Sequence, residues 1–199
     1  MKIHDISQEV FSCRVYPGDP APQKQTLSSM DSGALYNLTA FSMCAHNGTH
    51  IDAPRHFIAD GGAVDEMPLA STVGEAFVCA FDGDMDAEGA RTVLARAGGI
   101  PRILLKGTAV VSPGAAEEFA AAGVRLIASE SQSVGDENAP MAVHKILLSA
   151  NVALLEGVLL DGVEEGRYLL CAQPLKLKGA DGAPCRALLI ETEKGEWLW

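Results

Sequence analysis

The chain has 199 residues, of which 48% are hydrophobic and 21% charged, a composition typical of one globular domain. Its formal net charge is −11 without a basic cluster, so we expect no nucleic acid as partner. The beginning of the sequence lacks a signal-peptide pattern, and no apolar run is long enough to span a membrane. Five scattered cysteines without a Cys-x-x-Cys pair are typical of a reducing compartment. We therefore expect a cytoplasmic protein without a membrane partner.

Short runs of β-branched and aromatic residues in the first half of the chain predict strands. They lie at 10–16, 36–43 and 77–81, and the first is closed by a turn at 17–20. The second run leads directly into a segment rich in histidine.

Helices and strands alternate through the middle of the chain. Helices are predicted at 86–97, 112–122 and 138–149, the last two with Ser112 and Asn138 as caps. Apolar strands are predicted at 102–106, 124–128, 152–156, 168–172 and 186–190. Alternating leucine and lysine at 173–178 predict a half-exposed strand. This order indicates a single mixed α/β domain over residues 1–199.

Three of the five histidines lie close together with an aspartate, as His46, His50, Asp52 and His56. All four positions are even, so an extended segment would place their side chains on one face. In a helix, His46 and His50 would still share a face. Imidazole and carboxylate together suit divalent first-row metals, and packing gives no reason for imidazole at three positions of one parity. The pattern predicts a metal site, beside which we expect Cys44 to pack as a small apolar side chain.

Two later residues are candidates for the same site. His144 lies on the predicted helix at 138–149, and Glu156 ends the predicted strand at 152–156. Ligands gather at strand ends in α/β sheets, although an acid at such an end is often only solvated.

Together these residues resemble the metal-dependent cyclase/hydrolase family, which includes bacterial kynurenine formamidase and isatin hydrolase. Residues 46–56 are similar to the family's His-x-Gly-Thr-His-x-Asp-x-Pro-x-His signature without a gap. His144 and Glu156 match a histidine that stands twelve residues before the glutamate of a Leu-Glu-Gly turn. The resemblance covers nearly the whole chain, since four further segments are similar, at 5–7, 16–19, 174–177 and 183–187.

The resemblance implies a swivelling β/β/α domain that is usually a homo-oligomer, so we expect a dimer or tetramer. It implies that a first metal ion is held by His46, His50 and Asp52. A second ion would be reached by Asp52 and Glu156 and completed by His144. Formamidase-like members are implied to use two zinc ions and the isatin hydrolase branch manganese. We therefore expect one or two Zn²⁺ ions, with Mn²⁺ as the alternative.

The resemblance also implies roles in catalysis and substrate binding. His56, beyond Pro54 at the edge of the motif, would be the general acid/base. Tyr16 stands where formamidase-like members tend to have a tryptophan implied to contact the aromatic substrate; packing at a strand end is the alternative role. Those members also tend to have aspartate within the segment 129–134, where this chain has Glu130. Both differences leave the choice of formylkynurenine as substrate open.

These residues predict an enzyme that acts on a small molecule. A divalent metal lowers the pKa of a bound water from about 15.7 to about 7, and an imidazole can deliver a proton to a leaving nitrogen. We expect a metal-dependent hydrolase of an amide C–N bond, of arylformamidase-like type. The alternatives are a cyclic amide or lactone hydrolase of isatin hydrolase-like type, and a metal-binding protein without turnover. Against the last, structural zinc sites are usually rich in cysteine, whereas this set contains carboxylates.

Overall fold

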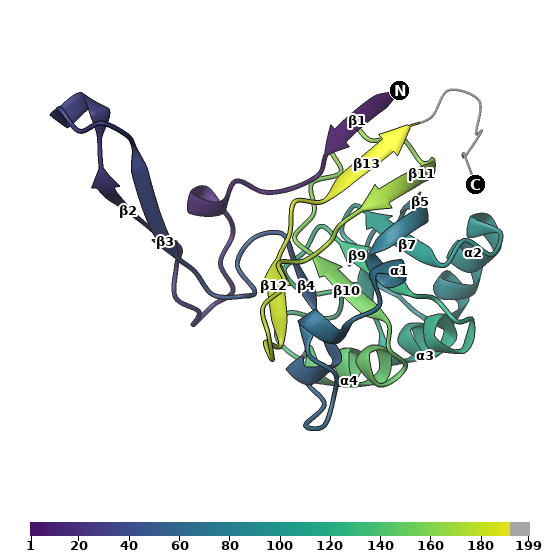
Figure 1. Ribbon diagram of the computed structural model, residues 1–199. Coiled ribbons are helices and arrows are strands. Elements are labelled where there is room, and N and C mark those ends of the chain that lie inside the picture. The colour runs from purple at the N-terminus through teal and green to yellow at the C-terminus, as the bar shows by residue number, and fades with distance from the viewer. Residues whose placement is uncertain (192–199) are drawn as a thin grey trace.

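The computed structural model describes residues 1–191, and its centre is a nine-stranded mixed sheet (Figure 1). The strands are ordered β1-β13-β11-β5-β7-β9-β10-β4-β12 across the sheet. In that order they span Lys2–Asp5, Leu188–Glu191, Gly166–Cys171, Val73–Ala80, Arg102–Lys106, Leu126–Ser129, Ala153–Glu156, His50–Asp52 and Gly182–Pro184. The mixed α/β class predicted from the sequence is confirmed.

Three helices cover one face of the sheet: α2 (Ala87–Ala97), α3 (Pro113–Ala121) and α4 (Met141–Ser149) (Figure 1). Each helix connects two neighbours in the parallel series β5-β7-β9-β10. Right-handed crossovers that advance in one direction across a sheet place all their helices on the same face, as observed here. The helices lie within the predicted ranges, and α3 begins with the predicted Ser112 cap, whose Oγ accepts the N–H of Ala115.

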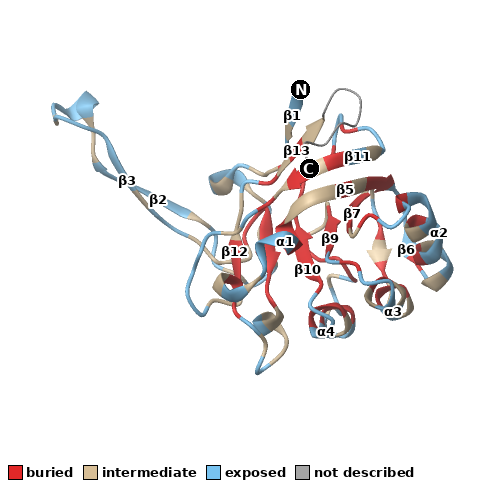
Figure 2. Ribbon diagram, turned by 45° about the vertical axis from the view of Figure 1, so that its right-hand side comes forward, coloured by how far each residue is buried: buried red, intermediate tan, exposed pale blue. Residues whose placement is uncertain are grey.

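The central strands of the sheet are buried on both faces, which Figure 2 shows as a band of buried residues. Along β7, Ile103 and Leu105 pack with the helices, whereas Leu104 belongs to the core on the opposite face. A strand buried on both sides has a continuous apolar sequence instead of an alternating one. For this reason the pattern at 102–106 predicted the strand correctly.

The predicted strands at 10–16 and 173–178 are wrong. Residues Val10–Ser12 form a 3₁₀-helix because the Glu9 carboxylate accepts the N–H groups of Phe11 and Ser12, at 3.1 and 2.9 Å. In the second segment only Pro174 makes a bridge, to Cys185, and proline has no N–H with which to continue a strand.

The predicted cap of α4 is also wrong. The helix begins at Met141 after Pro140. Asn138 lies in the preceding turn, where its N–H donates to the Asp136 carboxylate at 2.9 Å.

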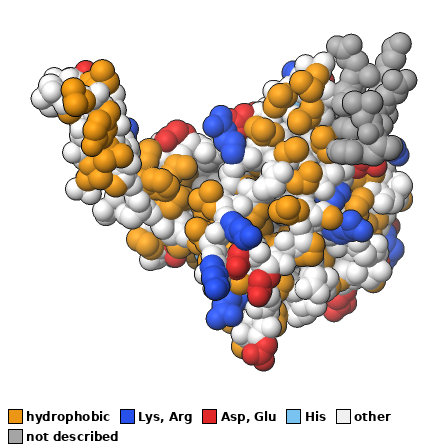
Figure 3. Space-filling view, viewed as in Figure 1, with side chains coloured by type: hydrophobic (Ala, Val, Ile, Leu, Met, Phe, Trp, Pro, Cys, Tyr) orange, Lys and Arg blue, Asp and Glu red, His pale blue; other side chains and the backbone are white. Residues whose placement is uncertain are grey.

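A two-stranded hairpin of β2 (Gln23–Ser28) and β3 (Leu38–Ser42) projects from the body of the molecule as an arm (Figure 1). The 3₁₀-helix Met30–Ser32 lies between its strands. β3 matches the predicted strand at 36–43, while β2 was not predicted because its sequence has no apolar alternation. Hydrophobic side chains nevertheless gather on the arm (Figure 3), and Leu35 is 94% exposed.

The remaining elements are short. They are β6 (Asp84–Met85), β8 (Val110–Val111), α1 (Leu69–Thr72) and the 3₁₀-helices Pro54–His56 and Val64–Glu66. Among the described residues, no helix has the length and apolar character needed to cross a membrane.

Candidate metal centre

The register of β4 places the first two candidate ligands. His50 and Asp52 point to the same side of β4, and Ile51 between them is buried in the core of the opposite face. β4 pairs antiparallel with β10, and His50 lies directly opposite Glu156. Because side chains of directly opposed residues are neighbours, the sheet brings an imidazole beside a carboxylate more than a hundred positions away in the sequence.

His144 reaches the same point from α4. Its Nε2 lies 3.2 Å from Glu156 Oε1 and 3.5 Å from Asp52 Oδ2. The Nε2 of His50 lies 3.4 Å from Asp52 Oδ1 and 3.5 Å from Glu156 Oε2. Two imidazole nitrogens and two carboxylates therefore converge on one small volume.

The other nitrogen of each ring is held by the backbone. His50 Nδ1 donates to the carbonyl of Gly48 at 2.9 Å, and His144 Nδ1 donates to the carbonyl of Pro140 at 2.9 Å. In a neutral imidazole this bond leaves the lone pair on Nε2, the atom that faces the carboxylates. Metal-binding histidines in proteins are commonly oriented in this way.

The spacing of these atoms fits an ion better than direct hydrogen bonds. Charge-assisted N–H···O bonds are about 2.7–2.9 Å long, shorter than the 3.2–3.5 Å found here. Two ligand atoms bound at about 2.1 Å to one tetrahedral metal ion are separated by about 3.4 Å. In addition, the buried Oδ2 of Asp52 has no hydrogen-bond partner among residues 1–191. The donor set and its spacing therefore fit a divalent metal ion.

Burial makes the charges of this cluster interdependent. Asp52 and Glu156 are 1% and 2% exposed, and buried carboxylates are costly unless cations compensate them. Burial alone would raise the pKa of Asp52, but the surrounding imidazoles hold it well below its usual range. Burial lowers the pKa of His50 and His144, but the two carboxylates outweigh this effect and raise each pKa to about 10.

His46 and His56 complete the histidine cluster, although neither lies in a strand. His46 is in a turn, and its Nδ1 lies 2.8 Å from Asp52 Oδ1. His56 ends the 3₁₀-helix Pro54–His56, with its Nε2 4.0 Å from Asp52 Oδ2. Their rings are stacked, with centroids 4.0 Å apart and an interplanar angle of 28°. The extended geometry considered for 46–56 therefore holds only for His50–Asp52.

The donor atoms form two overlapping groups. One contains His46, Asp52 and His56, and the other contains His50, Asp52 and Glu156. Asp52 is common to both, as the resemblance implies for a ligand shared between two ions. The family resemblance implies that His46 and His50 bind the same ion. In the structure, His50 instead groups with Glu156, and His46 groups with His56.

A cavity of about 430 Å³ opens over the cluster. Tyr16 lines it, and its hydroxyl donates to the backbone carbonyl of Glu137. Phe57 and Pro140 add apolar surface to the wall. Cys44 also lines the cavity, and burial raises the pKa of its thiol, so it is poorly suited to act as a nucleophile.

The sequence interpretation missed six residues that line this cavity: Asp19, Phe57, Gln132, Ser133, Pro140 and Asp181. Asp181 Oδ2 lies 2.9 Å from His46 Nε2 and 3.1 Å from His56 Nδ1. It precedes β12, which pairs with β4, and no local pattern in the sequence indicates that pairing. Glu130, where the family resemblance indicated a difference, instead accepts the N–H groups of Gly107 and Leu160, at 2.6 and 2.9 Å.

Comparison with known proteins gives consistent matches. The Cyclase family model, described as "Putative cyclase", matches residues 4–136. The kynurenine formamidase of Erythrobacter litoralis (strain HTCC2594) is 35% identical over 203 residues, covering 96% of this chain and 94% of that protein. A solved structure described as a potential metal-dependent hydrolase with cyclase activity has a TM-score of 0.82 at 27% identity. It covers 96% of this chain and 98% of its own. Isatin hydrolase A from Labrenzia aggregata, bound to benzyl benzoate, shares the fold, with a TM-score of 0.83 at 24% identity. The match covers 96% of this chain and 94% of that chain.

Proposed function

The chain belongs to the Cyclase family, and we propose that it is a metal-dependent hydrolase that cleaves an amide C–N bond in a small molecule. The observation that carries this proposal is the set of imidazole Nε2 atoms 3.2–3.5 Å from the oxygens of Asp52 and Glu156. Its relative in Erythrobacter litoralis bears the name kynurenine formamidase, which supports an arylformamidase-like reaction.

The residues that would hold the metal are His46, His50, Asp52, His144 and Glu156. Mixed imidazole and carboxylate ligands favour Zn²⁺, as one or two ions, with Mn²⁺ as the alternative. When bound, such an ion polarises a substrate carbonyl and makes a water molecule more acidic. The chain itself supplies a dry, preoriented set of ligands, because His50 and His144 are only 2% and 3% exposed.

His56 would be the general acid/base. Its side chain is 27% exposed and lines the cavity, so it is more accessible to substrate than the buried His50 and His144. Its Nδ1 is engaged by Asp181, so Nε2 is the atom available to exchange a proton with the substrate. Cleavage of a C–N bond requires a proton on the leaving nitrogen, which an imidazole can deliver near neutral pH.

The cavity wall supports an aromatic amide as the substrate. Tyr16 and Phe57 present rings beside the histidine cluster, and we assign Tyr16 a contact with the substrate ring. Replacement Tyr16→Trp would then change the ratio of kcat/KM values among aryl substrates while leaving metal content unchanged. Equal ratios in both proteins would make Tyr16 a packing residue.

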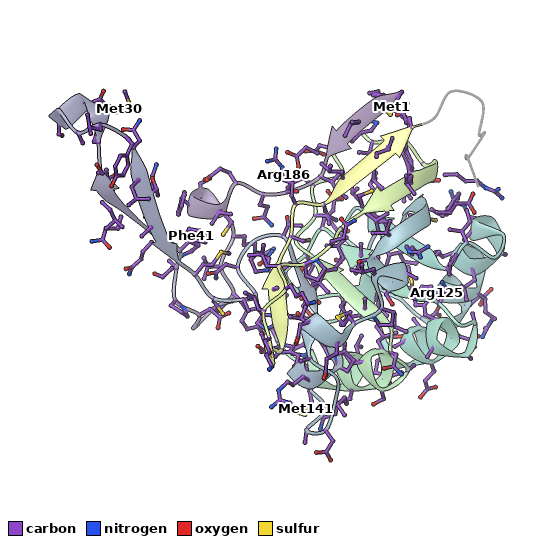
Figure 4. All side chains as sticks on the ribbon, viewed as in Figure 1. Met1, Met30, Phe41, Arg125, Met141 and Arg186 are labelled. Carbon is purple, nitrogen blue, oxygen red and sulfur yellow. The ribbon has the colours of Figure 1, made fainter. Side chains whose placement is uncertain are left out.

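The projecting arm supports a homo-oligomer, a dimer or tetramer. Met30 lies at the far end of the arm and Phe41 at the end nearest the body (Figure 4), and both side chains are more than half exposed, at 58% and 56%. A second cavity of about 430 Å³ lies at the base of the arm and is lined by apolar residues that include Phe41, Met43 and Leu175. A second copy of the chain would cover both surfaces at once. The five cysteines are free thiols, which are typical of a reducing compartment. We therefore expect this oligomer in the cytoplasm.

The reaction is tested by measuring bound metal together with hydrolysis of N-formyl aryl amines, isatin and lactones. We expect stoichiometric divalent metal and fastest turnover of the N-formyl aryl amines, abolished by a chelator and restored by metal. Preference for isatin or a lactone would instead support the cyclic amide or lactone hydrolase. Bound metal without turnover of any of them would indicate a metal-binding protein.

A further inference from the structure

One carboxylate oxygen contacts both stacked histidines of the site. Asp181 Oδ2 lies 2.9 Å from Nε2 of His46 and 3.1 Å from Nδ1 of His56. It thus meets the two rings at different nitrogens. Each oxygen of Asp52 also lies within 4 Å of two histidines, but the side chain of Asp52 is buried, at 1% exposed. The side chain of Asp181 is 46% exposed.

These contacts determine which nitrogen carries the proton on each ring. An ionised carboxylate only accepts hydrogen bonds, so His46 must donate from Nε2 and His56 from Nδ1. The opposite nitrogens face Asp52. His46 Nδ1 lies 2.8 Å from Asp52 Oδ1 and donates to it as long as no metal ion replaces that proton, whereas His56 Nε2 lies 4.0 Å from Asp52 Oδ2. With a metal ion in the site, Asp181 therefore keeps the remaining proton of His46 on Nε2 and a proton of His56 on Nδ1. His46 Nδ1 is then left to bind the ion and His56 Nε2 to exchange a proton with the substrate.

The surrounding backbone holds Asp181 in this place. Its carbonyl accepts the N–H of Ala53 at 2.9 Å, which ties it to the end of β4. The next residue, Gly182, leaves room for the imidazole, since a Cβ there would lie only 2.7 Å from His46 Cε1. The Asp65 carboxylate accepts the N–H of Gly179 at 2.8 Å and anchors the preceding turn.

We propose that Asp181 is a positioning residue that fixes the tautomers and ring orientations of His46 and His56. The inference rests on the proposed function in that it assigns these rings to a metal ligand and a proton donor. Asp181 itself acts through the two histidines. Removing such an outer partner of a metal-binding histidine typically lowers metal affinity or activity by about 10–100-fold.

Two readouts without substrate test the inference. In protein labelled with ¹⁵N at histidine and loaded with Zn²⁺, NMR identifies the protonated nitrogen of each ring. We expect His56 as the Nδ1–H tautomer in the wild type and loss of that single tautomer in Asp181→Ala. Competition with a chelator is expected to show Zn²⁺ affinity lowered by about 10–100-fold. Asp181→Asn retains an acceptor oxygen and is expected to keep the Nδ1–H tautomer with a smaller loss of affinity.

Turnover supplies a third readout. We expect Asp181→Ala to lower kcat with little change in KM, and to lower it less for an activated anilide, whose leaving group needs less help from His56. The matched control is Asp161→Asn, which removes one negative charge from an exposed turn outside the site and is expected to match the wild type in all three measurements.

An unchanged His56 tautomer in Asp181→Ala would overturn the inference. Unchanged Zn²⁺ affinity together with unchanged kcat would do so as well. If Asp181→Ala does not fold, the test rests on Asp181→Asn. The inference is then contradicted if folded Asp181→Asn loses the single His56 tautomer but binds Zn²⁺ as tightly as the wild type. Because the tautomer and the affinity are measured without substrate, they test Asp181 even if the protein hydrolyses no amide.

Discussion

At the scale of single residues, the two stacked histidines have different environments, and so we expect different roles. His46 lies 2.8 Å from Asp52 Oδ1, while the closest carboxylate oxygen to His56 Nε2 is 4.0 Å away. A ligand must contact the ion, whereas a proton donor needs access to substrate. The more exposed His56 meets the second requirement better.

We therefore expect His56→Ala to retain its metal and lose turnover by about 10²–10⁴-fold, the usual contribution of general acid/base catalysis. The loss should be greatest for amides with poor leaving nitrogens and smaller for activated anilides. Metal analysis and steady-state kinetics on both substrate types measure these effects. If the variant is purified without metal, His56 is a ligand and its assigned role is wrong.

The buried charges predict an unusual pH dependence for the metal-free protein. The pKa values of His50 and His144 are raised from the ordinary 6.5 to about 10, so their stabilisation is complete below about pH 6.5 and lost as the pH rises through about 10. The pKa of Asp52 is lowered from 3.8, so its contribution is complete above that value and lost at lower pH.

The Tm of the metal-free protein should consequently be highest between about pH 4 and 6.5 and fall toward pH 10. Metal requires neutral imidazoles, so the additional stabilisation by metal should increase over the same range. Thermal unfolding with and without chelator measures both trends. A metal-free Tm that rises steadily from pH 6.5 to 10 would contradict this description of the buried cluster.

At the scale of elements, the site depends on three strands in register. β4 lies between β10 and β12, so that His50 faces Glu156 on one side and Asp52 faces Gly182 on the other. Gly182 is needed at its position because an added Cβ would lie 2.7 Å both from Cε1 of the His46 ring and from the backbone oxygen of Ile51 in β4.

Replacement Gly182→Ala is expected to displace the ring of His46 and to shift β12 locally away from β4. Metal binding should weaken by about tenfold or more, while the overall secondary-structure content is retained. Gly62→Ala is a matched control, since an added Cβ there would meet only Glu66 Oε2, at 3.8 Å. Metal titration and circular dichroism of the two variants test the difference. Equal affinities in the two variants would show that the ring of His46 can move without consequence.

At the scale of the whole molecule, the arm of β2 and β3 exposes hydrophobic side chains that the body of the molecule does not cover. Among residues 1–191 its strands pair only with each other, and Leu35 and Tyr36 near its turn are 94% and 60% exposed. Burying each such side chain stabilises an assembly by about 1.5–3 kcal/mol. Contact between copies, as proposed above, would account for an arm of this composition.

We therefore expect the double variant Leu35→Ser/Phe41→Ser to dissociate the oligomer while the body stays folded. Leu159→Ser is the control, because Leu159 is 47% exposed but lies outside the arm. Sedimentation velocity gives the mass of each protein. A monomeric wild type, or an unchanged mass in the double variant, would exclude this role of the arm.

The sequence predicted those parts of the molecule whose structure follows from local patterns. Helix α3, capped by Ser112, and the doubly buried strand β7 are examples. The run at 10–16 had the composition of a strand, but the Glu9 carboxylate satisfies its first backbone donors locally. Hairpin strand β2 was missed because its residues are exposed on a separate arm and carry no pattern of burial.

The candidate site follows the same division. His46, His50, Asp52 and His56 are close in sequence, and the family resemblance indicates His144 and Glu156. Asp181 was missed because only the pairing of β12 with β4 brings it to the histidines. A contact that depends on the pairing of distant strands cannot be predicted from a local sequence pattern.

We propose that this cluster binds the metal on which hydrolysis depends, and metal content in His50→Ala tests this most directly. His4→Ala is the matched control, because His4 is the one histidine outside the cluster and bonds to Glu191 at 2.6 Å. Elemental analysis of folded protein should find at least one divalent ion per chain in the wild type and in His4→Ala, and little in His50→Ala, with amide hydrolysis lost in parallel. Full metal content in His50→Ala, or a wild type that binds no divalent metal, would contradict the account.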